Sequence, residues 1–306
     1  MKDLQQIVIQ NLLKTKESSR IFHGRGRLWA GFEHVVIDYF SPHLLITIYK
    51  EKESEAEFIK ELVQSLKEIP DLVIENILLQ KRYLSRPELI AVEGSIPTIA
   101  EALERGSKFN LKFGDTQNIG FFLDMSPGRE MLERISQNKK VLNLFSYTCS
   151  LSVAALKGEA SGVVNIDMSK AALSVGESNH LLNKLDMNKV RFLPYDIMKS
   201  WNKIFKFGPY DIVVIDPPTN QGDSFKVERD YYKIVKRLNE MTNNEAVIMA
   251  CLNSPHLTSQ FLIDLFKEHA PEFKFEEIIY SAFNSMETNP EEGLKIVVFK
   301  KLTCQE

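Results

Sequence analysis

Residues 140–167, KVLNLFSYTCSLSVAALKGEASGVVNID, contain the pattern that decides the fold of this chain. Residues 141–145 form an apolar run of strand length, a short turn follows, and residues 151–156 have a helical composition. A second apolar run, residues 162–166, ends at Asp167. The stretch predicts a strand, a turn, a helix and a second strand. A carboxylate at the tip of the second strand is placed to bind the ribose hydroxyls of an adenosine cofactor.

The turn between the first strand and the helix lacks the G-x-G-x-x-G pattern of dinucleotide-binding folds. Without those glycines, a pyrophosphate over the helix N-terminus is not expected. An adenosine compound that carries no phosphates fits the turn better, and S-adenosylmethionine (SAM) is the predicted cofactor.

Residues 143–148, Asn-Leu-Phe-Ser-Tyr-Thr, resemble the N-L-F-S-Y-T-G signature of the bacterial 23S ribosomal RNA methyltransferases that make 5-methylcytosine or 7-methylguanine. The resemblance extends from about Arg20 to the C-terminus. It implies SAM as the cofactor and RNA, in particular ribosomal RNA, as the partner. The chain departs from the signature at Cys149, which occupies the place of its glycine. A Cβ atom there would crowd the cofactor or disfavour a positive φ angle.

The composition is that of an ordinary soluble globular protein. At 306 residues, with 44% hydrophobic and 26% charged residues, the chain is long enough for two domains. No apolar run approaches the roughly 20 residues of a membrane helix, and the N-terminus does not resemble a signal peptide. A cytoplasmic location without membrane contact is therefore expected. Cys149, Cys251 and Cys304 are too few and too scattered for a disulfide framework or a metal site.

The net charge of −3 gives no overall basic footprint, which counts against RNA binding unless a local basic stripe exists. Residues 20–29, RIFHGRGRLW, are basic and rich in glycine, with aromatic residues between the cations. This segment is a candidate for phosphate contacts, and an ordinary surface loop is the alternative. The oligomeric state stays open, with a homodimer among the alternatives.

We expect three segments: an N-terminal helix over residues 1–17, a small α+β domain over residues 18–115 and a SAM-dependent methyltransferase domain over residues 116–306. The small domain resembles the middle domain of the methyltransferases named above and would serve RNA substrate recognition. No segment corresponds to the RNA-binding PUA domain that some members carry at the N-terminus. The predicted elements of the small domain are strands over 35–40, 44–49, 73–80 and 89–93, a helix over 54–69, and a hairpin formed by 99–104 and 108–113.

In the last domain, uniformly apolar short strands alternate with helices, which predicts a parallel sheet covered on both faces. The expected strands are residues 141–145, 162–166, 190–194, 210–216, 245–251, 277–283 and 294–300. A loop rather than a helix joins the last two, which favours an antiparallel final strand. The predicted fold class is α/β, a class I SAM-methyltransferase Rossmann-like fold with a seven-stranded, mostly parallel sheet, preceded by the small α+β domain. Ser126 and Ser169 are predicted helix N-caps.

Acidic and amide side chains follow four neighbouring strands of this domain, and in such sheets the ligand lies beyond the carboxyl ends of the strands. Asp167 is expected to accept from both ribose hydroxyls, Met168 to pack on the adenine, and Asp196 to accept from its amino group. Residues 117–124 resemble the family's Q-x-x-G-x-F-L-D segment, which adds two residues by resemblance. The predicted cofactor-binding residues are Phe122, Asp124, Asn143, Phe145, Ser146, Tyr147, Thr148, Asp167, Met168, Asp196, Ile197 and Asp216.

Residues 216–219, Asp-Pro-Pro-Thr, resemble the family's D-P-P-[ST]-F motif, although Asn220 replaces its phenylalanine. Proline has no N–H, so this loop offers carbonyls and a rigid rim to a flat base. The predicted catalytic residues are Asp216, Pro217, Pro218 and Asn253, the last of which aligns with the family's cysteine position. The predicted substrate-binding residues are Arg129, Thr219, Phe225, Arg229 and Tyr232.

Alternatives remain for several of these residues. Arg129 matches a family arginine and is equally well explained as a solvated helix residue. Phe225 or Tyr232 is expected to stack on an extruded base and Arg229 to hold a phosphate, with ordinary packing at a helix start as the alternative.

The residues of the fifth strand distinguish methylation of cytosine C5 from methylation of guanine N7. Methylation of cytosine C5 needs a cysteine thiolate that adds to the ring, and Cys251 lies two residues before the family's cysteine position, which favours a core role. Guanine N7 already has a lone pair, so its methylation needs only positioning and exclusion of water. The predicted function is SAM-dependent methylation of a 23S ribosomal RNA base, with guanine N7 slightly preferred over cytosine C5. A non-catalytic SAM- or RNA-binding protein, or a methyltransferase of a protein or small molecule, is the alternative.

Overall fold

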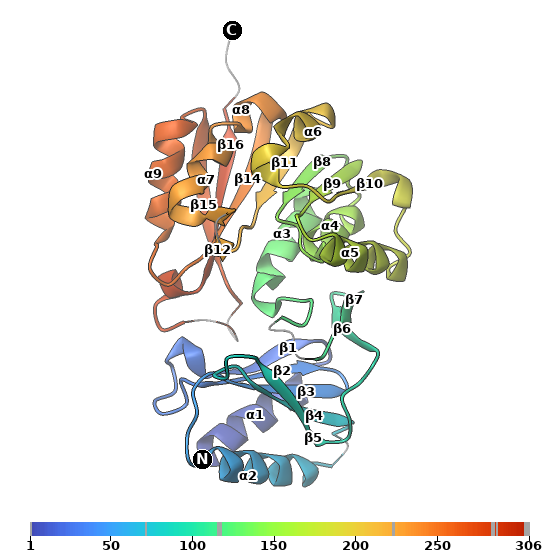
Figure 1. Cartoon of the computed structure of the whole chain (residues 1–306), viewed down its shortest axis with the longest axis vertical. Coiled ribbons are helices and arrows are strands. Elements are labelled where there is room, and N and C mark those ends of the chain that lie inside the picture. Colours follow the sequence, from blue (N-terminus) through green and yellow to red (C-terminus); the bar gives the residue numbers. More distant parts are fainter. Residues whose placement is uncertain are drawn as a thin grey trace. The chain divides into compact units, whose positions relative to one another are not determined.

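The computed structural model describes residues 2–70, 72–114, 118–221, 224–282, 285 and 287–302, and it divides the chain into two compact units (Figure 1). Unit 1 comprises Met1–Leu123 and Phe283–Thr288, and unit 2 comprises Asp124–Ala282 and Asn289–Glu306. None of the helices in the described ranges is long and apolar enough to cross a lipid bilayer. Three residues that entered the sequence predictions, Gln117, Phe283 and Cys304, lie outside these ranges.

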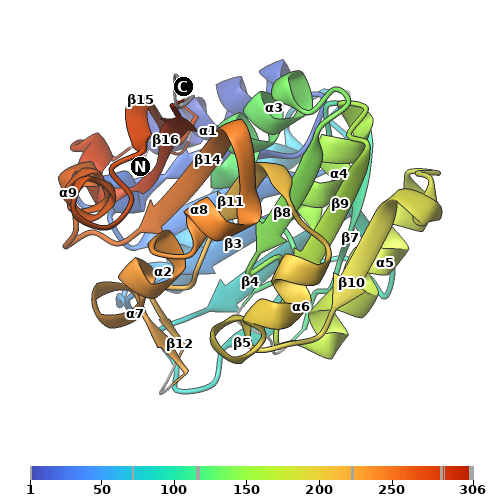
Figure 2. The same ribbon diagram turned by 90° about the horizontal axis from the view of Figure 1, so that it is seen from above.

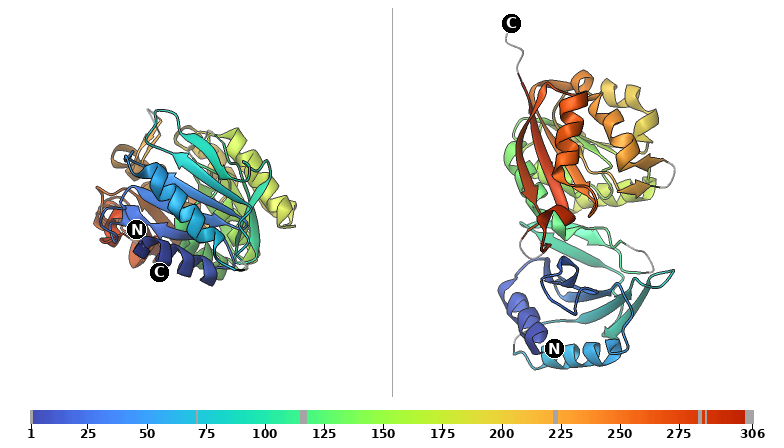
Figure 3. Two further views of the ribbon diagram at one scale, coloured as in Figure 1. Left: turned by 90° about the horizontal axis from the view of Figure 1, so that it is seen from below. Right: turned by 90° about the vertical axis from the view of Figure 1, so that its left-hand side faces the viewer.

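Unit 1 is built on a five-stranded sheet in the order β1-β2-β3-β4-β5. The strands are β1 Ser19–His23, β2 Val35–Phe40, β3 His43–Ile48, β4 Asn76–Lys81 and β5 Glu88–Glu93. Helices α1 (Lys2–Lys14) and α2 (Glu55–Lys67) lie side by side against this sheet and bury their apolar stripes in one core with it (Figure 3). The predicted hairpin is confirmed, because β6 (Ala100–Glu104) pairs antiparallel with β7 (Ser107–Leu111).

Unit 2 confirms the predicted seven-stranded sheet, with the order β10-β9-β8-β11-β14-β16-β15. The first five strands in this order are parallel, and β16 runs antiparallel to both of its neighbours, as expected for the final strand. The strands are β8 Lys140–Leu144, β9 Gly162–Ile166, β10 Val190–Leu193, β11 Tyr210–Ile215, β14 Thr242–Asn253, β15 Phe273–Tyr280 and β16 Leu294–Lys301. The direction of winding reverses between β8 and β11, which places the ligand crevice of such a fold beyond their carboxyl ends.

Helices cover both faces of this sheet, as the apolar strands predict (Figure 2). One face packs against α3 (Ser126–Ile135) and α4 (Ser150–Lys157), with α5 (Lys170–Leu182) next to α4 and β10. The other face packs against α6 (Trp201–Lys206), α7 (Val227–Val235), α8 (Leu238–Met241) and α9 (Ser259–His269). A short hairpin of β12 (Asn220–Gln221) and β13 (Phe225–Lys226) precedes α7.

The two predicted N-caps have different outcomes. Ser169 caps α5, since its hydroxyl accepts a hydrogen bond from the Ala172 amide at 3.1 Å. The prediction for Ser126 is wrong, because α3 begins at Ser126 itself and its N-cap residue is Met125, which makes no side-chain cap. The 3-10 turn Leu123–Met125 runs directly into the helix, so the first helical turn starts one residue earlier than the Ser-Pro pair indicates.

A chain of buried polar side chains crosses unit 2 beneath the crevice. Asn143 donates to Asn165 at 2.9 Å, Asn165 donates to the Ser152 hydroxyl at 2.9 Å, and that hydroxyl lies 2.8 Å from His180 Nε2. His180 Nδ1 lies 2.7 Å from the Gly176 carbonyl, which can only accept, so Nδ1 carries the proton and Nε2 accepts from Ser152. Burial lowers the pKa of His180 and keeps the ring neutral. The hydrogen bonds from Asn143 through Asn165 and Ser152 to His180 therefore all run in one donor-to-acceptor direction.

The neutral state of His180 predicts a loss of stability in acid. Because the pKa of His180 is lower in the folded protein than its ordinary value of 6.5, the unfolded chain binds the extra proton first, and stability falls as the pH drops below 6.5. We expect wild type to lose more unfolding free energy than His180→Gln between about pH 7.5 and about pH 5.5, by up to about 1.4 kcal/mol per pH unit. Urea denaturation at the two pH values measures the difference.

The comparison with the variant is needed because burial also lowers the pKa of His34 and of His43. Those two histidines are common to both proteins, so their contribution cancels. An equal acid loss in wild type and His180→Gln would show that Ser152 does not require the neutral ring.

Candidate functional site

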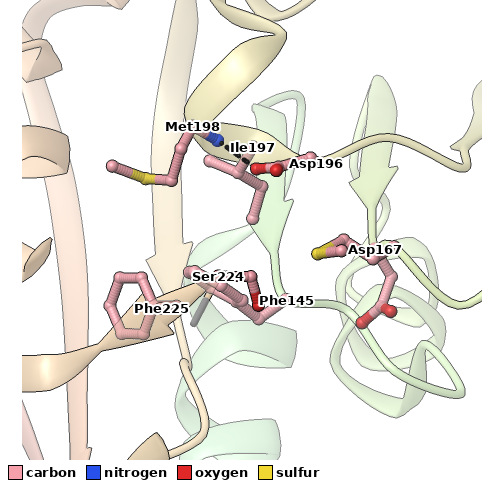
Figure 4. A pocket seen from close by; sticks show the side chains of 8 residues that line it. Phe145, Asp167, Asp196, Ile197, Met198, Ser224 and Phe225 are labelled. Carbon is pink, nitrogen blue, oxygen red and sulfur yellow. Dashed lines mark hydrogen bonds between the residues drawn. The ribbon is translucent and has the colours of Figure 1, made fainter. Parts of the chain in front are cut away.

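The carboxyl ends of β8, β9 and β10 form a crevice in unit 2 (Figure 4). Its lining residues are Phe145, Asp167, Met168, Asp196, Ile197, Met198, Ser224 and Phe225. Five of the predicted cofactor residues thus meet in one place. The enclosed volume is about 10 Å³, room for about one water molecule. Met168 and Met198, which line it, are unbranched and adaptable side chains.

Asp167 ties the turn after β8 to the tip of β9. One carboxylate oxygen accepts from the Tyr147 amide at 2.8 Å, and the other accepts from the Ser169 amide at 2.8 Å. Each oxygen has a further lone pair, so the carboxylate is oriented by the backbone and can still accept from two hydroxyl groups.

The turn itself is held in a strained backbone conformation. Phe145, Tyr147 and Cys149 have φ angles of 57°, 46° and 61°, in the left-handed region that non-glycine residues rarely adopt. Each costs about 1–2 kcal/mol, and strain of this kind concentrates at ligand sites, where the surroundings enforce it. Here the Asn179 side chain contributes by donating to the Thr148 carbonyl at 3.0 Å.

Cys149 adopts the positive φ that is typical of the glycine in the signature that residues 143–148 resemble, and Gly176 makes room for its thiol. The Cys149 side chain is fully buried and is not among the crevice-lining residues. A Cβ atom on Gly176, inside α5, would lie 2.5 Å from the Cys149 sulfur. The missing side chain at Gly176 therefore makes room for the sulfur, and burial raises the pKa of the thiol, which keeps it protonated.

Asp216, at the end of β11, belongs to a small charged cluster. Burial, and secondly the nearby Asp124 carboxylate, raise the pKa of Asp216 to about 7, and the Arg129 guanidinium partly offsets both effects. Arg129 is 2% exposed, and its Nη1 donates to the Ser150 hydroxyl at 3.4 Å. The interpretation of Arg129 as a solvated helix residue is therefore wrong, since it lies buried beside the carboxylates at this strand end.

The loop after β11 is fastened to the end of β14. The Thr219 hydroxyl donates to the Asn253 carbonyl at 2.6 Å, which brings these two predicted residues together. Beneath them, the Tyr231 hydroxyl lies 3.3 Å from the carbonyls of both Ile215 and Cys251. Cys251 is fully buried, as its predicted core role requires, and burial raises its pKa well above the ordinary value.

Lys295 is a structural contributor that the sequence prediction missed. It is completely buried, and its ammonium donates to the carbonyls of Ser254, Glu291 and Gly293 at 2.8, 2.5 and 3.0 Å. Burial lowers its pKa, and the Glu291 carboxylate opposes that shift. The lysine thus holds the chain directly after Asn253. Its sequence context, a strand-forming run, gives no signal of this role.

Two predicted residues are placed differently from the prediction. Asn143 is 1% exposed and turns into the polar chain with Asn165, so its side chain does not line the crevice. Phe225 lines the crevice but is 1% exposed, and its ring packs edge-on against Phe145 with 4.9 Å between centroids. Because an exposed ring face is needed for stacking, the base-stacking prediction for Phe225 is wrong, and packing is its role.

The remaining predicted residues lie elsewhere. Arg229 is held by the Asp230 carboxylate, with Nη2 to Oδ2 at 2.6 Å. Tyr232 lies beside Lys236 and lines a different hollow from the cofactor crevice. Phe122 belongs to unit 1 and is 43% exposed. Ser146 and Thr148 are buried within the turn, and the Ser146 hydroxyl has no hydrogen-bond partner among the described residues. Met198 and Ser224, which do line the crevice, carry no sequence signal.

A family model described as S-adenosylmethionine-dependent methyltransferase matches residues 19–300. Ribosomal RNA large subunit methyltransferase I of Aeromonas salmonicida (strain A449) is 31% identical over 195 residues, which cover 61% of this chain and 48% of that protein. Ribosomal RNA large subunit methyltransferase K/L of Colwellia psychrerythraea (strain 34H) is 28% identical over 261 residues, which cover 77% of this chain and 36% of that protein. The chain spans about half the length or less of these two curated relatives.

A solved structure of a methyltransferase complexed with S-adenosylhomocysteine (SAH) matches with a TM-score of 0.83, covering 97% of this chain and 80% of that chain. Because the identity is 23%, this match shows a shared fold.

The contact between Gly176 and Cys149 predicts a coupled pair of substitutions. Gly176→Ala would place a Cβ atom 2.5 Å from the Cys149 sulfur, so we expect a loss of about 1–3 kcal/mol through overpacking. Without this clash, alanine in a helix interior is more stable than glycine by about 1 kcal/mol. The double variant Cys149→Gly/Gly176→Ala should recover most of the loss. Urea denaturation of all four proteins measures the coupling, and additive effects would contradict the assigned contact.

Proposed function

Since this chain belongs to the S-adenosylmethionine-dependent methyltransferase family, we propose that it transfers a methyl group from SAM to a base of large-subunit ribosomal RNA. The family match over residues 19–300 carries the SAM-dependent methyltransferase part of the proposal. The RNA substrate is supported by the names of the two curated relatives, both ribosomal RNA large subunit methyltransferases. Such a substrate accords with the cytoplasmic location that the sequence predicts.

The residues of the crevice fit an adenosine cofactor. Asp167, oriented by two amides, would accept from the ribose hydroxyls, and Met168, which is 47% exposed, would cover one face of the adenine. Asp196 keeps lone pairs beyond its bond from the Met198 amide and would accept from the adenine amino group. The unpartnered hydroxyl of Ser146 and the strained backbone beside it would face the methionyl part. When bound, SAM supplies an electrophilic methyl group on a sulfonium ion.

We infer that guanine N7 is the target rather than cytosine C5. C5 chemistry needs a reactive thiolate, and both cysteines in the described ranges, Cys149 and Cys251, are buried with raised pKa values. For N7, the protein needs only to orient a flat base against the loop of Asp216, Pro217 and Pro218 and to exclude water. Asn253, fastened to Thr219, would close one side of that base site.

The negative charge of Asp216 would assist this reaction. Methyl transfer to N7 moves a positive charge from the sulfonium to the base, and an ionised carboxylate nearby favours charge that develops there. Asp124 adds a second carboxylate, and Arg129 limits the repulsion between the two.

A protein that binds SAM and RNA without turnover is the second candidate, favoured by Asn220, which replaces the phenylalanine of the D-P-P-[ST]-F motif. Transfer of tritium from labelled SAM to deproteinised ribosomal RNA separates the two candidates, because a binding protein gives no labelled RNA. A mass-spectrometric map of modified bases, made with and without the protein, then identifies the nucleotide and atom.

Replacement of Asp167 tests the cofactor site. Asp167→Ala removes the acceptor of both ribose hydroxyls, and hydrogen bonds to charged groups contribute about 1.5–3 kcal/mol each, so we expect SAH to bind at least about 100-fold more weakly. Titration calorimetry with SAH measures the affinity. Asp186→Ala is the matched control, because Asp186 also accepts from the amide two residues ahead but lies before β10, at the amino ends of the parallel strands and away from the crevice. Unchanged SAH affinity in Asp167→Ala would overturn the assignment.

The raised pKa of Asp216 predicts a pH dependence of catalysis. Below about pH 7 the carboxyl group is protonated, and above it the assisting negative charge is present. We expect kcat/KM for methyl transfer to rise about tenfold per pH unit below 7 and to level off above it. Asp216→Asn should be slower and should lack this bend, since an amide does not titrate. A bend near 7 that persists in the variant would assign it to another group.

A further inference from the structure

A second hollow of unit 2 lies between α6 and α7 and has a volume of about 340 Å³. Its lining residues are Met198, Trp201, Tyr232, Lys233, Lys236 and Arg237, and we call it the α6–α7 groove. Of these residues, only Tyr232 entered the sequence-based site. Two large aromatic rings and three cations therefore share one concave surface outside the cofactor crevice.

The rings and cations of this groove are already paired with one another. The Lys236 ammonium lies 4.9 Å from the centroid of the Tyr232 ring, and the Arg237 guanidinium lies 6.0 Å from that of Trp201. Proteins that bind single-stranded nucleic acid combine aromatic platforms, on which bases stack, with cations that track the phosphates. The composition of the groove is of this kind.

The charge balance of the groove is positive although the chain as a whole carries −3. Lys233 is paired with Asp230 at 2.7 Å, and Arg237 with Glu240 at 3.1 Å. The Arg237–Glu240 pair is exposed on both sides and weak enough for a phosphate to compete with it. Asp230 is buried and shared between Arg229 and Lys233, so the positive charges around it outnumber its single negative charge. In the part of the chain that the structure describes, Lys236 has no carboxylate partner, so it presents a full positive charge to the groove.

The groove also adjoins the cofactor crevice, because Met198 lines both. A strand lying in the groove would therefore reach the cofactor crevice at Met198, on the side of Asp196. We propose that the α6–α7 groove binds the unpaired RNA strand that flanks the target base, with bases stacked on Trp201 and Tyr232 and phosphates held by Lys233, Lys236 and Arg237. The proposal rests on the proposed function for its choice of RNA as the occupant.

Two sets of variants test the groove in the full chain, with a fluorescent 12-nucleotide single-stranded RNA of mixed sequence as the probe. Tyr232→Ala should bind this RNA about 5- to 150-fold more weakly, whereas Tyr232→Phe, which keeps the ring, should bind like wild type. Trp201 is less suited to substitution, because it packs against the hydrophobic core.

The second set of variants tests the positive charges by removing two exposed lysines. Lys233→Ala/Lys236→Ala should weaken binding and should reduce the slope of log K against log salt concentration by about 1.4, or about 0.7 for each lost phosphate contact. Lys139→Ala/Lys189→Ala is the matched control with the same change of charge. Both of its lysines are exposed and directly precede β8 and β10, at the amino ends of the parallel strands, so binding should not change.

Methyl transfer from tritiated SAM to deproteinised ribosomal RNA separates failure of the groove from failure of the proposed function. Raised KM with retained kcat in both groove variants supports the groove. RNA transfer by wild type together with unchanged binding in both groove variants overturns the groove and leaves the function standing. Oligonucleotide binding that depends on Tyr232 and the lysines, without transfer to RNA, overturns the function and supports the groove. Equal, Tyr232-dependent binding of a duplex would overturn the single-stranded occupant.

Discussion

The carboxylate of Asp167 is the contact on which the rest of the site depends. β8 and β9 are parallel and in register, with Leu144 opposite Ile166, so their ends emerge at the same level. The Asp167 carboxylate then joins the two ends by accepting from the Tyr147 amide. A charged acceptor makes such a bond stronger than one between neutral groups. The turn after β8 is thereby held in a conformation that its own residues disfavour.

The buried polar chain beneath the turn explains how that conformation persists. A half-satisfied buried network is destabilising, whereas a satisfied one favours a single arrangement. Asn165, Ser152 and His180 are each satisfied only if β9, α4 and α5 keep their relative positions. Asn179, one residue before His180, holds the Thr148 carbonyl from the same helix. Helix α5, which contributes His180 to the polar chain, thus also supports the turn. Gly176, which makes room for the Cys149 sulfur, lies on the same helix.

The sequence predicts the sheet of unit 2 well because most of its strands are short apolar runs, a pattern that does not depend on distant contacts. β15, with the charged and exposed run FKFEEIIY, is the exception, and it begins at Phe273, four residues before the predicted start. Side-chain direction is harder to predict. Asn143 lies on the same face of β8 as Val141, two residues before it, so its side chain points into the face that packs against α3 and α4 and not into the crevice. Gly176 and Lys295 act through Cys149 and Ser254, which are distant from them in the sequence. No local sequence pattern predicts these contacts.

Unit 2 separates its charges in a way that suits a cation and a polyanion in adjacent sites. Near the crevice, Asp167, Asp196 and Asp216 follow three different strands. The pKa of Asp216 is raised mainly by burial and further by repulsion from the Asp124 carboxylate. A sulfonium ion would relieve that repulsion, whereas a phosphate would increase it. Beyond Met198 the sign reverses, because lysines and an arginine line the α6–α7 groove. The negative crevice and the positive groove together orient a bound RNA strand. Its phosphates favour the groove, and only a base, which carries no charge, can enter the crevice without electrostatic cost.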